Sequence, residues 1–130
     1  MTAAIEVHGL TKRYGPVVAL DGVTLSIERD SITGLLGRNG AGKTVLMSLI
    51  TAHETPTSGT VRVLGEDPRE NERVLGQTCF VRDNQRYPDE FRVPHLLDTG
   101  ARFYPSWDAE LAGRVVETFE LPTDRDVRKL

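Results

Sequence analysis

The sequence predicts an α/β protein organised around a glycine-rich loop, and three observations carry this prediction. Apolar and polar residues alternate in the first third of the chain, which is typical of half-buried strands. The glycine-rich motif at residues 37–44 follows a short apolar run and precedes an amphipathic segment. From Val93 onward, apolar residues recur at helical spacing. Strands, then a strand–loop–helix unit, then paired helices are the layout of an α/β domain.

Two stretches near the beginning of the chain predict antiparallel strands. Ile5 and Val7 alternate with polar neighbours, and so do the apolar residues within 23–27. A period of two places successive side chains on opposite faces of a sheet. Val61 and Val63 follow a turn at residues 56–59 and face the same side of a further strand.

Two short apolar runs predict buried strands. Residues 33–36 lead into Gly37, and residues 78–81 form the second run, after a short helix near residues 69–75. Cys79 lies within the second run and is expected to be a small core residue. It is the one cysteine of the chain, so it cannot form an internal disulfide, which fits a reducing compartment.

Three further helices follow from the spacing of apolar residues. One is expected over residues 45–52, directly after the glycine-rich loop, and another from Val93 to Tyr104. Pro105 interrupts that pattern. Ser106 or Asp108 can cap the last helix. Its apolar face consists of Leu111, Ala112, Val115, Val116 and Phe119.

Residues 37–44 read Gly-Arg-Asn-Gly-Ala-Gly-Lys-Thr and match the phosphate-loop pattern G-x-x-x-x-G-K-[ST]. Glycines let the backbone adopt positive φ and approach anionic oxygens closely. The N–H groups at the start of the next helix then form an anion site. Lys43 is expected to contact the β- and γ-phosphates of a nucleoside triphosphate, and the Thr44 hydroxyl to ligate Mg²⁺. The predicted nucleotide contacts are Gly37, Arg38, Asn39, Gly40, Ala41, Gly42, Lys43, Thr44 and Val45.

These residues resemble the Walker A loop of the ATP-binding-cassette (ABC) ATPases, and the resemblance covers essentially the whole chain. Residues 5–15, Ile-Glu-Val-His-Gly-Leu-Thr-Lys-Arg-Tyr-Gly, are similar to the first strand and aromatic loop of that family. The resemblance implies that ATP is the nucleotide and that Tyr14 stacks on adenine. Val-Arg-Asp-Asn-Gln at residues 81–85 resembles the Q-loop. By that match Gln85 ligates Mg²⁺ or positions the attacking water, so Lys43 and Gln85 are the implied catalytic residues.

The same resemblance implies that the chain is the N-terminal half of one nucleotide-binding domain. The β subdomain and phosphate-loop core are expected at residues 1–90, and the start of the helical subdomain at residues 91–130. Three later motifs of the family do not occur in the sequence: a Ser-Gly-Gly-Gln-like signature, four apolar residues followed by Asp-Glu, and a switch histidine. His8, His53 and His95 lie elsewhere. The chain is therefore expected to be truncated.

The resemblance also implies partners. These are a transmembrane permease and a second nucleotide-binding subunit in the full-length parent, at the cytoplasmic face of the cell membrane. The sequence has neither an apolar run of about 18 residues nor the pattern of a signal peptide, so we expect membrane association through a partner. The aromatic cluster at residues 103–107 is interpreted mainly as core, and alternatively as a docking surface for the permease. A net charge of −3 argues against nucleic-acid binding.

Three alternatives to a transporter ATPase come from other classes. A non-catalytic nucleotide-binding or docking fragment agrees with the missing catalytic segment. A soluble ABC protein of translation or DNA repair is less consistent with the compact spacing from Thr44 to Gln85 and the lack of a basic arm. A GTPase or small kinase is disfavoured because no Asn-Lys-x-Asp motif occurs and because the early strands read as antiparallel.

Overall fold

In the computed structural model, which describes residues 3–130, the chain begins with a long antiparallel hairpin. Strands β1 (Ala3–Tyr14) and β2 (Val17–Glu28) form it, and β3 (Ser58–Val63) pairs antiparallel with the other edge of β1. The strand order is therefore β2-β1-β3. Val7 of the central strand faces Leu25 on one side and Val61 on the other, and it is fully buried. The prediction of antiparallel strands in this part of the chain is confirmed.

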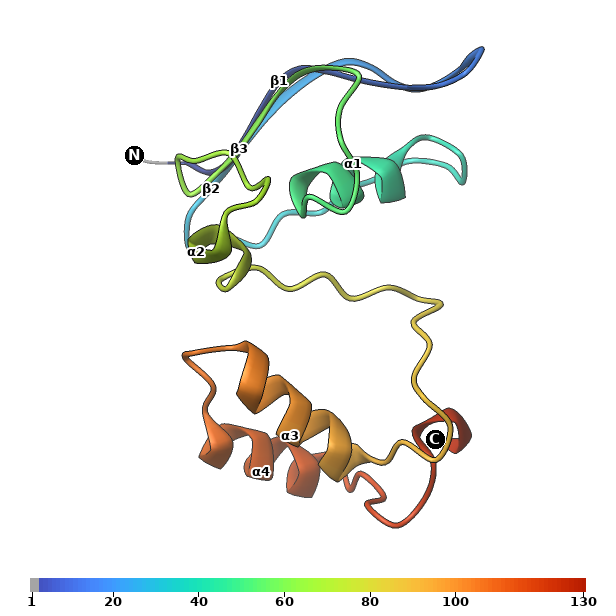
Figure 1. Ribbon diagram of the computed structural model, residues 1–130, viewed down its shortest axis with the longest axis vertical. Coiled ribbons are helices and arrows are strands. Elements are labelled where there is room, and N and C mark those ends of the chain that lie inside the picture. Colours follow the sequence, from blue (N-terminus) through green and yellow to red (C-terminus); the bar gives the residue numbers. More distant parts are fainter. Residues whose placement is uncertain (1–2) are drawn as a thin grey trace. The chain divides into compact units, whose positions relative to one another are not determined.

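The chain divides into two compact units, one ending at Phe80 and one beginning at Val81 (Figure 1). Each unit is described separately below. The first unit holds the three-stranded sheet, helix α1 (Lys43–Ile50) and helix α2 (Glu72–Leu75). The second holds helices α3 (Val93–Phe103) and α4 (Ala109–Thr118) and the 3-10 turn η1 (Val127–Lys129).

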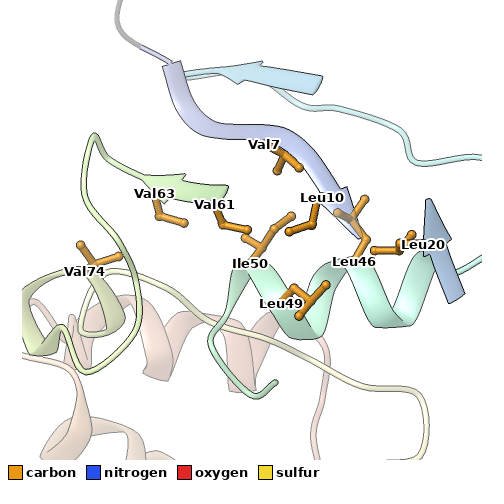
Figure 2. Close-up of a cluster of buried hydrophobic side chains, with 9 residues drawn as sticks. All are labelled: Val7, Leu10, Leu20, Leu46, Leu49, Ile50, Val61, Val63 and Val74. Carbon is orange, nitrogen blue, oxygen red and sulfur yellow. The ribbon is translucent and has the colours of Figure 1, made fainter. Parts of the chain in front are cut away.

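The core of the first unit lies between the sheet and α1 (Figure 2). Leu46, Leu49 and Ile50 are buried, and their spacing of three and four residues places them on one face of the helix. In Figure 2, Leu46 and Ile50 point toward the side chains of the strands. The buried cluster consists of Val7, Leu10, Leu20, Leu46, Leu49, Ile50, Val61, Val63 and Val74. Burying a side chain of this kind contributes about 1.5–3 kcal/mol, so this cluster fixes the start of α1 against the sheet.

Helix α1, which follows the glycine-rich loop, and helix α2, which follows β3, differ in their bounds from the prediction. Helix α1 begins at Lys43, two residues before the expected start, because Gly42 takes the N-cap position. It ends at Ile50, and Ala52 adopts a positive φ of 59°. Helix α2 is a single turn that starts after Asn71, whose side chain accepts a hydrogen bond from the Val74 N–H at 3.2 Å. Its buried Val74 completes the core.

The two predicted buried strands do not form. Residues 33–36 and 78–81 lie outside the three-stranded sheet, which contains all strands of the described residues. Ile32 and Leu36 are almost fully exposed, and Val81 is 76% exposed. An apolar run becomes a strand when neighbouring strands satisfy its backbone N–H and C=O groups, and residues 3–130 supply no such neighbour here. Cys79 is exposed, so its interpretation as a core residue was wrong.

Helix α3 lies where the sequence predicts it, and α4 begins at one of the two predicted caps. His95 Nδ1 accepts a hydrogen bond from the Arg92 N–H at 2.9 Å at the start of α3, and the helix ends before Pro105. Of the two candidate caps for α4, Asp108 is the one used: its carboxylate accepts from the Leu111 N–H at 2.8 Å. The Trp107 ring packs against Gly100 of α3, where a Cβ atom would lie 2.6 Å from the ring.

The predicted apolar face of α4 forms, but within the described residues it is largely exposed to solvent. Leu111, Val115 and Phe119 are 49%, 40% and 70% exposed. The aromatic cluster at residues 103–107 divides: Trp107 packs inward on α3, whereas Phe103 is 73% exposed. Its interpretation as core therefore holds for one end of the cluster only.

The end of the chain is fastened to the segment that precedes α3. The Asp126 carboxylate accepts hydrogen bonds from the Glu90 N–H at 3.3 Å and from the Arg128 N–H at 2.9 Å. The Val127 N–H donates to the Phe91 carbonyl at 2.7 Å. Arg128 forms ion pairs with Asp89 at 2.8 Å and with Asp126 at 3.0 Å. The contacts with Asp89, Glu90 and Phe91 join residues that are more than 30 positions apart in the sequence.

Candidate nucleotide-binding site

The glycine-rich loop has the backbone geometry of an anion site. Gly40 and Gly42 adopt positive φ angles of 84° and 90°, and the Ala41 N–H donates to the Arg38 carbonyl at 3.0 Å. Helix α1 then begins at Lys43 without a side-chain cap. The first N–H groups of a helix have no intrahelical partner, and the helix dipole adds partial positive charge there. The end of the loop is therefore suited to an anion.

Gly42 is required at the point where the loop meets the sheet. A Cβ atom on this residue would lie 2.5 Å from the Ala19 carbonyl oxygen and 2.8 Å from Leu20 Cδ2. No side chain fits at these distances. Because α1 is seated directly on β2 here, the position of the first helical N–H groups is fixed by the sheet.

Lys43 places its charge over the same loop. Its ammonium group donates a hydrogen bond to the Gly37 carbonyl, which closes the loop from its first residue to its seventh. Thr44 is exposed in the first turn of α1, and within the described residues its hydroxyl makes no hydrogen bond. A cation, open N–H groups and a free hydroxyl thus converge on one short segment. This combination can hold a phosphate chain and leaves an oxygen ligand for a divalent cation.

Tyr14 lies at the end of the same hairpin that supports the loop. It pairs with Val17 across the hairpin, and Ala19, which Gly42 contacts, is two residues further along β2. Two strand residues span about 7 Å. The sheet therefore connects the end of the hairpin that carries Tyr14 to the strand residues that support the phosphate loop. The Tyr14 side chain is 42% exposed.

Three interactions fix the Tyr14 side chain. Its hydroxyl donates to a carboxylate oxygen of Glu54, in the loop that follows α1. The Lys12 ammonium lies 5.1 Å from the centroid of the ring and donates to the Thr55 carbonyl at 2.7 Å. The hydrogen bond to Glu54 raises the pKa of the Tyr14 hydroxyl above its ordinary value, since ionisation would remove the donor and place two negative charges together.

Gln85 belongs to the second unit. It lies in a segment without helix or strand between residues 81 and 92, and its side-chain oxygen is 3.5 Å from the Arg82 N–H. It is exposed. Its role as a ligand of Mg²⁺ or of the attacking water stays a prediction.

Sequence reasoning missed Lys12 and Glu54. Lys12 could have been found, because residues two apart on a strand share a face and Tyr14 is two residues further on. Glu54 had no local signal. Two hydrogen bonds fasten the loop after α1 to β1: the Thr57 N–H donates to the Thr11 carbonyl at 2.9 Å, and the Arg13 N–H donates to the Thr57 hydroxyl at 2.9 Å.

The glycine-rich loop leads into a helix that packs on a sheet, and a lysine side chain lies over the loop. This arrangement defines the class of phosphate-loop nucleotide-binding proteins. The comparisons with known proteins specify the family. The family model described as ABC transporter matches residues 20–126. The chain therefore belongs to the ABC transporter family and represents the N-terminal part of its ATP-binding domain.

Curated relatives and solved structures agree with this assignment. The chain is 31% identical to the ABC transporter ATP-binding protein YtrB of Bacillus subtilis, over 97% of this chain and 43% of that protein. It is 35% identical to the phosphonates import ATP-binding protein PhnC 1 of Natronomonas pharaonis, over 84% of this chain and 45% of that protein. A solved ATP-binding subunit of an ABC transporter matches with a TM-score of 0.79 and 25% identity, over 92% of this chain and 51% of that one. The chain spans about half the length of the relatives it matches.

None of the helices within residues 3–130 is long and apolar enough to cross a lipid bilayer.

Proposed function

We propose that this chain is the nucleotide-binding part of an ABC transporter ATPase subunit, which couples ATP binding and hydrolysis to transport across the membrane. One observation carries the proposal: Gly40, Gly42 and Lys43 form an anion site at the start of α1 in a chain that belongs to this family. In this proposal, residues 37–45 surround the phosphates and Lys43 neutralises the β- and γ-phosphate oxygens.

The base and the divalent cation have their own proposed residues. Tyr14 stacks on adenine, because its ring is partly exposed at the end of the hairpin whose second strand supports the phosphate loop at Ala19. The hydroxyl of Thr44 and the side-chain oxygen of Gln85 are the proposed ligands of Mg²⁺. Bound Mg²⁺ would neutralise the charge that develops on the phosphate oxygens during transfer. The free hydroxyl of Thr44 in the first turn of α1 fits such a ligand.

The partners and the location are part of the same proposal. YtrB and PhnC 1 are by name ATP-binding proteins of transporters, which supports a transmembrane permease and a second nucleotide-binding subunit as partners. The exposed Phe103, Leu111 and Phe119 of the second unit support a docking role for that unit. We place the protein in the cytoplasm, peripheral at the inner face of the cell membrane. The proposed division into a β subdomain with phosphate-loop core at 1–90 and a helical part at 91–130 follows from the same family.

A binding module without turnover is the second candidate. The 130 residues contain no run of four apolar residues followed by Asp-Glu, and hydrolysis in this family uses that carboxylate as catalytic base. Such a module would bind ATP through the same loop and differ only in phosphate release.

Replacement of Lys43 by alanine tests the phosphate loop. We expect Lys43→Ala to abolish binding of a fluorescent ATP analogue, because it removes the cation over the loop and no side chain from the buried core. The circular dichroism spectrum should stay unchanged. Lys129→Ala, which removes the same charge at an exposed position in η1, is the matched control. Equal affinities in the parent and in Lys43→Ala would overturn the proposal.

A further inference from the structure

The Tyr14 ring is held on one face and at its tip. Lys12 Nζ lies 5.1 Å from the ring centroid, within the range of about 6 Å in which a cation is attracted to an aromatic face. This ammonium group is itself fixed, because it donates to the Thr55 carbonyl at 2.7 Å. The hydroxyl at the tip donates to Glu54. One face of the ring is therefore occupied by a positive charge, and rotation about the side-chain bonds is restrained.

We propose that Lys12 and Glu54 are positioning residues that fix Tyr14 so that a single ring face accepts the adenine base. We call Lys12, Tyr14, Glu54 and Thr55 the Tyr14 clamp. This inference rests on the proposed nucleotide-binding function and adds two residues and a direction of approach to it. The base stacks on the face opposite Lys12, and the clamp loses its conformational entropy during folding rather than during binding.

The occupied face explains why Lys12 and Glu54 act together. Glu54, in the loop after α1, fixes the ring at its edge. Lys12, on β1, fixes it at its face and is bound to the same loop through the Thr55 carbonyl. Stacking of a base on an aromatic side chain contributes to affinity for any nucleotide base and not for a bare phosphate chain. The clamp should therefore change the affinity for ATP and leave the affinity for inorganic triphosphate unchanged.

A double-mutant cycle on the full chain tests the edge contact, with ATP and inorganic triphosphate as the two ligands. We expect Tyr14→Ala to weaken ATP about 5- to 150-fold, the range for loss of base stacking. Tyr14→Phe and Glu54→Ala should each weaken ATP about two- to tenfold. The double variant Tyr14→Phe, Glu54→Ala should lose no more than either single variant, because both remove the same hydrogen bond. Glu54→Gln keeps an acceptor and should bind like the parent.

Lys12→Met tests the occupied face. We expect a loss of ATP affinity of about two- to fivefold, because the ring loses the cation that supports its far side. If the base instead displaces Lys12, this variant will bind ATP equally well or more tightly, and the proposed direction of approach is wrong. Lys129→Met removes the same charge away from Tyr14 and should bind like the parent. For the acidic residue, Asp21→Ala is the matched control, since Asp21 is exposed on β2 and its side chain makes no hydrogen bond within the described residues.

The outcomes separate the clamp from the function on which it rests. Loss of ATP affinity in Tyr14→Ala, with parent-like affinity in Glu54→Ala, would overturn the clamp and leave the nucleotide site standing. Equal loss for ATP and inorganic triphosphate in Glu54→Ala would make Glu54 a structural support of the fold, which also overturns the clamp. Undiminished binding in Lys43→Ala would instead remove the proposed function itself.

Discussion

At the scale of single residues, the phosphate loop depends on glycines, which have no Cβ atom, as much as on the side chain of Lys43. Gly42 combines a φ of 90° with a carbonyl oxygen 2.5 Å from the place of a Cβ atom. Lys43 then lies directly after the residue that permits the close approach. The cation is therefore positioned by the glycine, and the pattern G-K in the sequence has a geometric reason.

Substitution of Gly42 by alanine should destabilise the first unit and abolish nucleotide binding. A left-handed backbone conformation costs a non-glycine residue about 1–3 kcal/mol, and the collision with Ala19 shifts the start of α1. Urea unfolding followed by circular dichroism measures the first effect, and titration with a fluorescent ATP analogue measures the second. Gly34→Ala is the control, because Gly34 has open space at the Cβ position and no positive φ. A Gly42→Ala variant that matches the parent in both measurements would contradict the role given to this glycine.

At the scale of elements, the packing of helix α1 on the sheet fixes the position of the phosphate loop. Its buried face packs on β2 and β3 and its first residue carries the cation. In the second unit, the contacts of Asp126 and its neighbour fix the segment that leads into α3. It fastens η1 to the residues just before that helix, and this segment is the continuation of the chain from Gln85.

The contacts of Asp126 predict a pH dependence. Hydrogen bonds from Arg128 lower the pKa of the Asp126 carboxyl from 3.8 to about 2. Because the folded-state pKa lies below the ordinary value, the unfolded chain binds more protons in this interval. The stabilisation is therefore fully present above about pH 4 and is lost as the pH falls toward 2. The chemical shift of the Glu90 amide, followed by NMR, should titrate with a midpoint near 2.

Two variants make this titration specific to Asp126. Asp126→Asn should abolish the transition of the Glu90 amide, whereas Asp124→Asn, at an exposed carboxylate two residues away, should leave it in place. A midpoint near 3.8 in the parent would show that Arg128 does not hold the carboxylate in solution.

At the scale of the whole chain, the proposed nucleotide site is formed within these 130 residues, and their sequence holds no recognisable base for hydrolysis. Turnover requires the attacking water and the developing charge to be held together. The residues proposed to stabilise the charge are Lys43, Thr44 and Gln85, and no Asp-Glu follows an apolar run in these 130 residues.

We therefore expect Mg²⁺-ATP to bind without steady phosphate release. A phosphate-release assay on the purified chain measures this, with Lys43→Ala as the blank. Continuous release that disappears in Lys43→Ala would show that the catalytic machinery is complete within these 130 residues. A signal of equal size in both proteins would come from a contaminant and would support the expectation.

The phosphate loop, the antiparallel strands, the bounds of α3 and the start of α4 could all be predicted from the sequence. These features depend on neighbours in the chain: the spacing of glycines, the alternation of apolar residues, the cap at Asp108 and the break at Pro105. The family resemblance was available from the same local motifs, and the match to residues 20–126 confirms it.

The tertiary structure alone decided which apolar runs became strands and what surrounds Tyr14. Residues 33–36 and 78–81 have the composition of buried strands, yet strand formation depends on hydrogen-bonding partners that residues 3–130 do not provide. Glu54 lies 40 residues from Tyr14 in the chain and reaches its hydroxyl because β3 returns beside β1. Contacts of this kind depend on how distant segments pack, and no local pattern of residues specifies them.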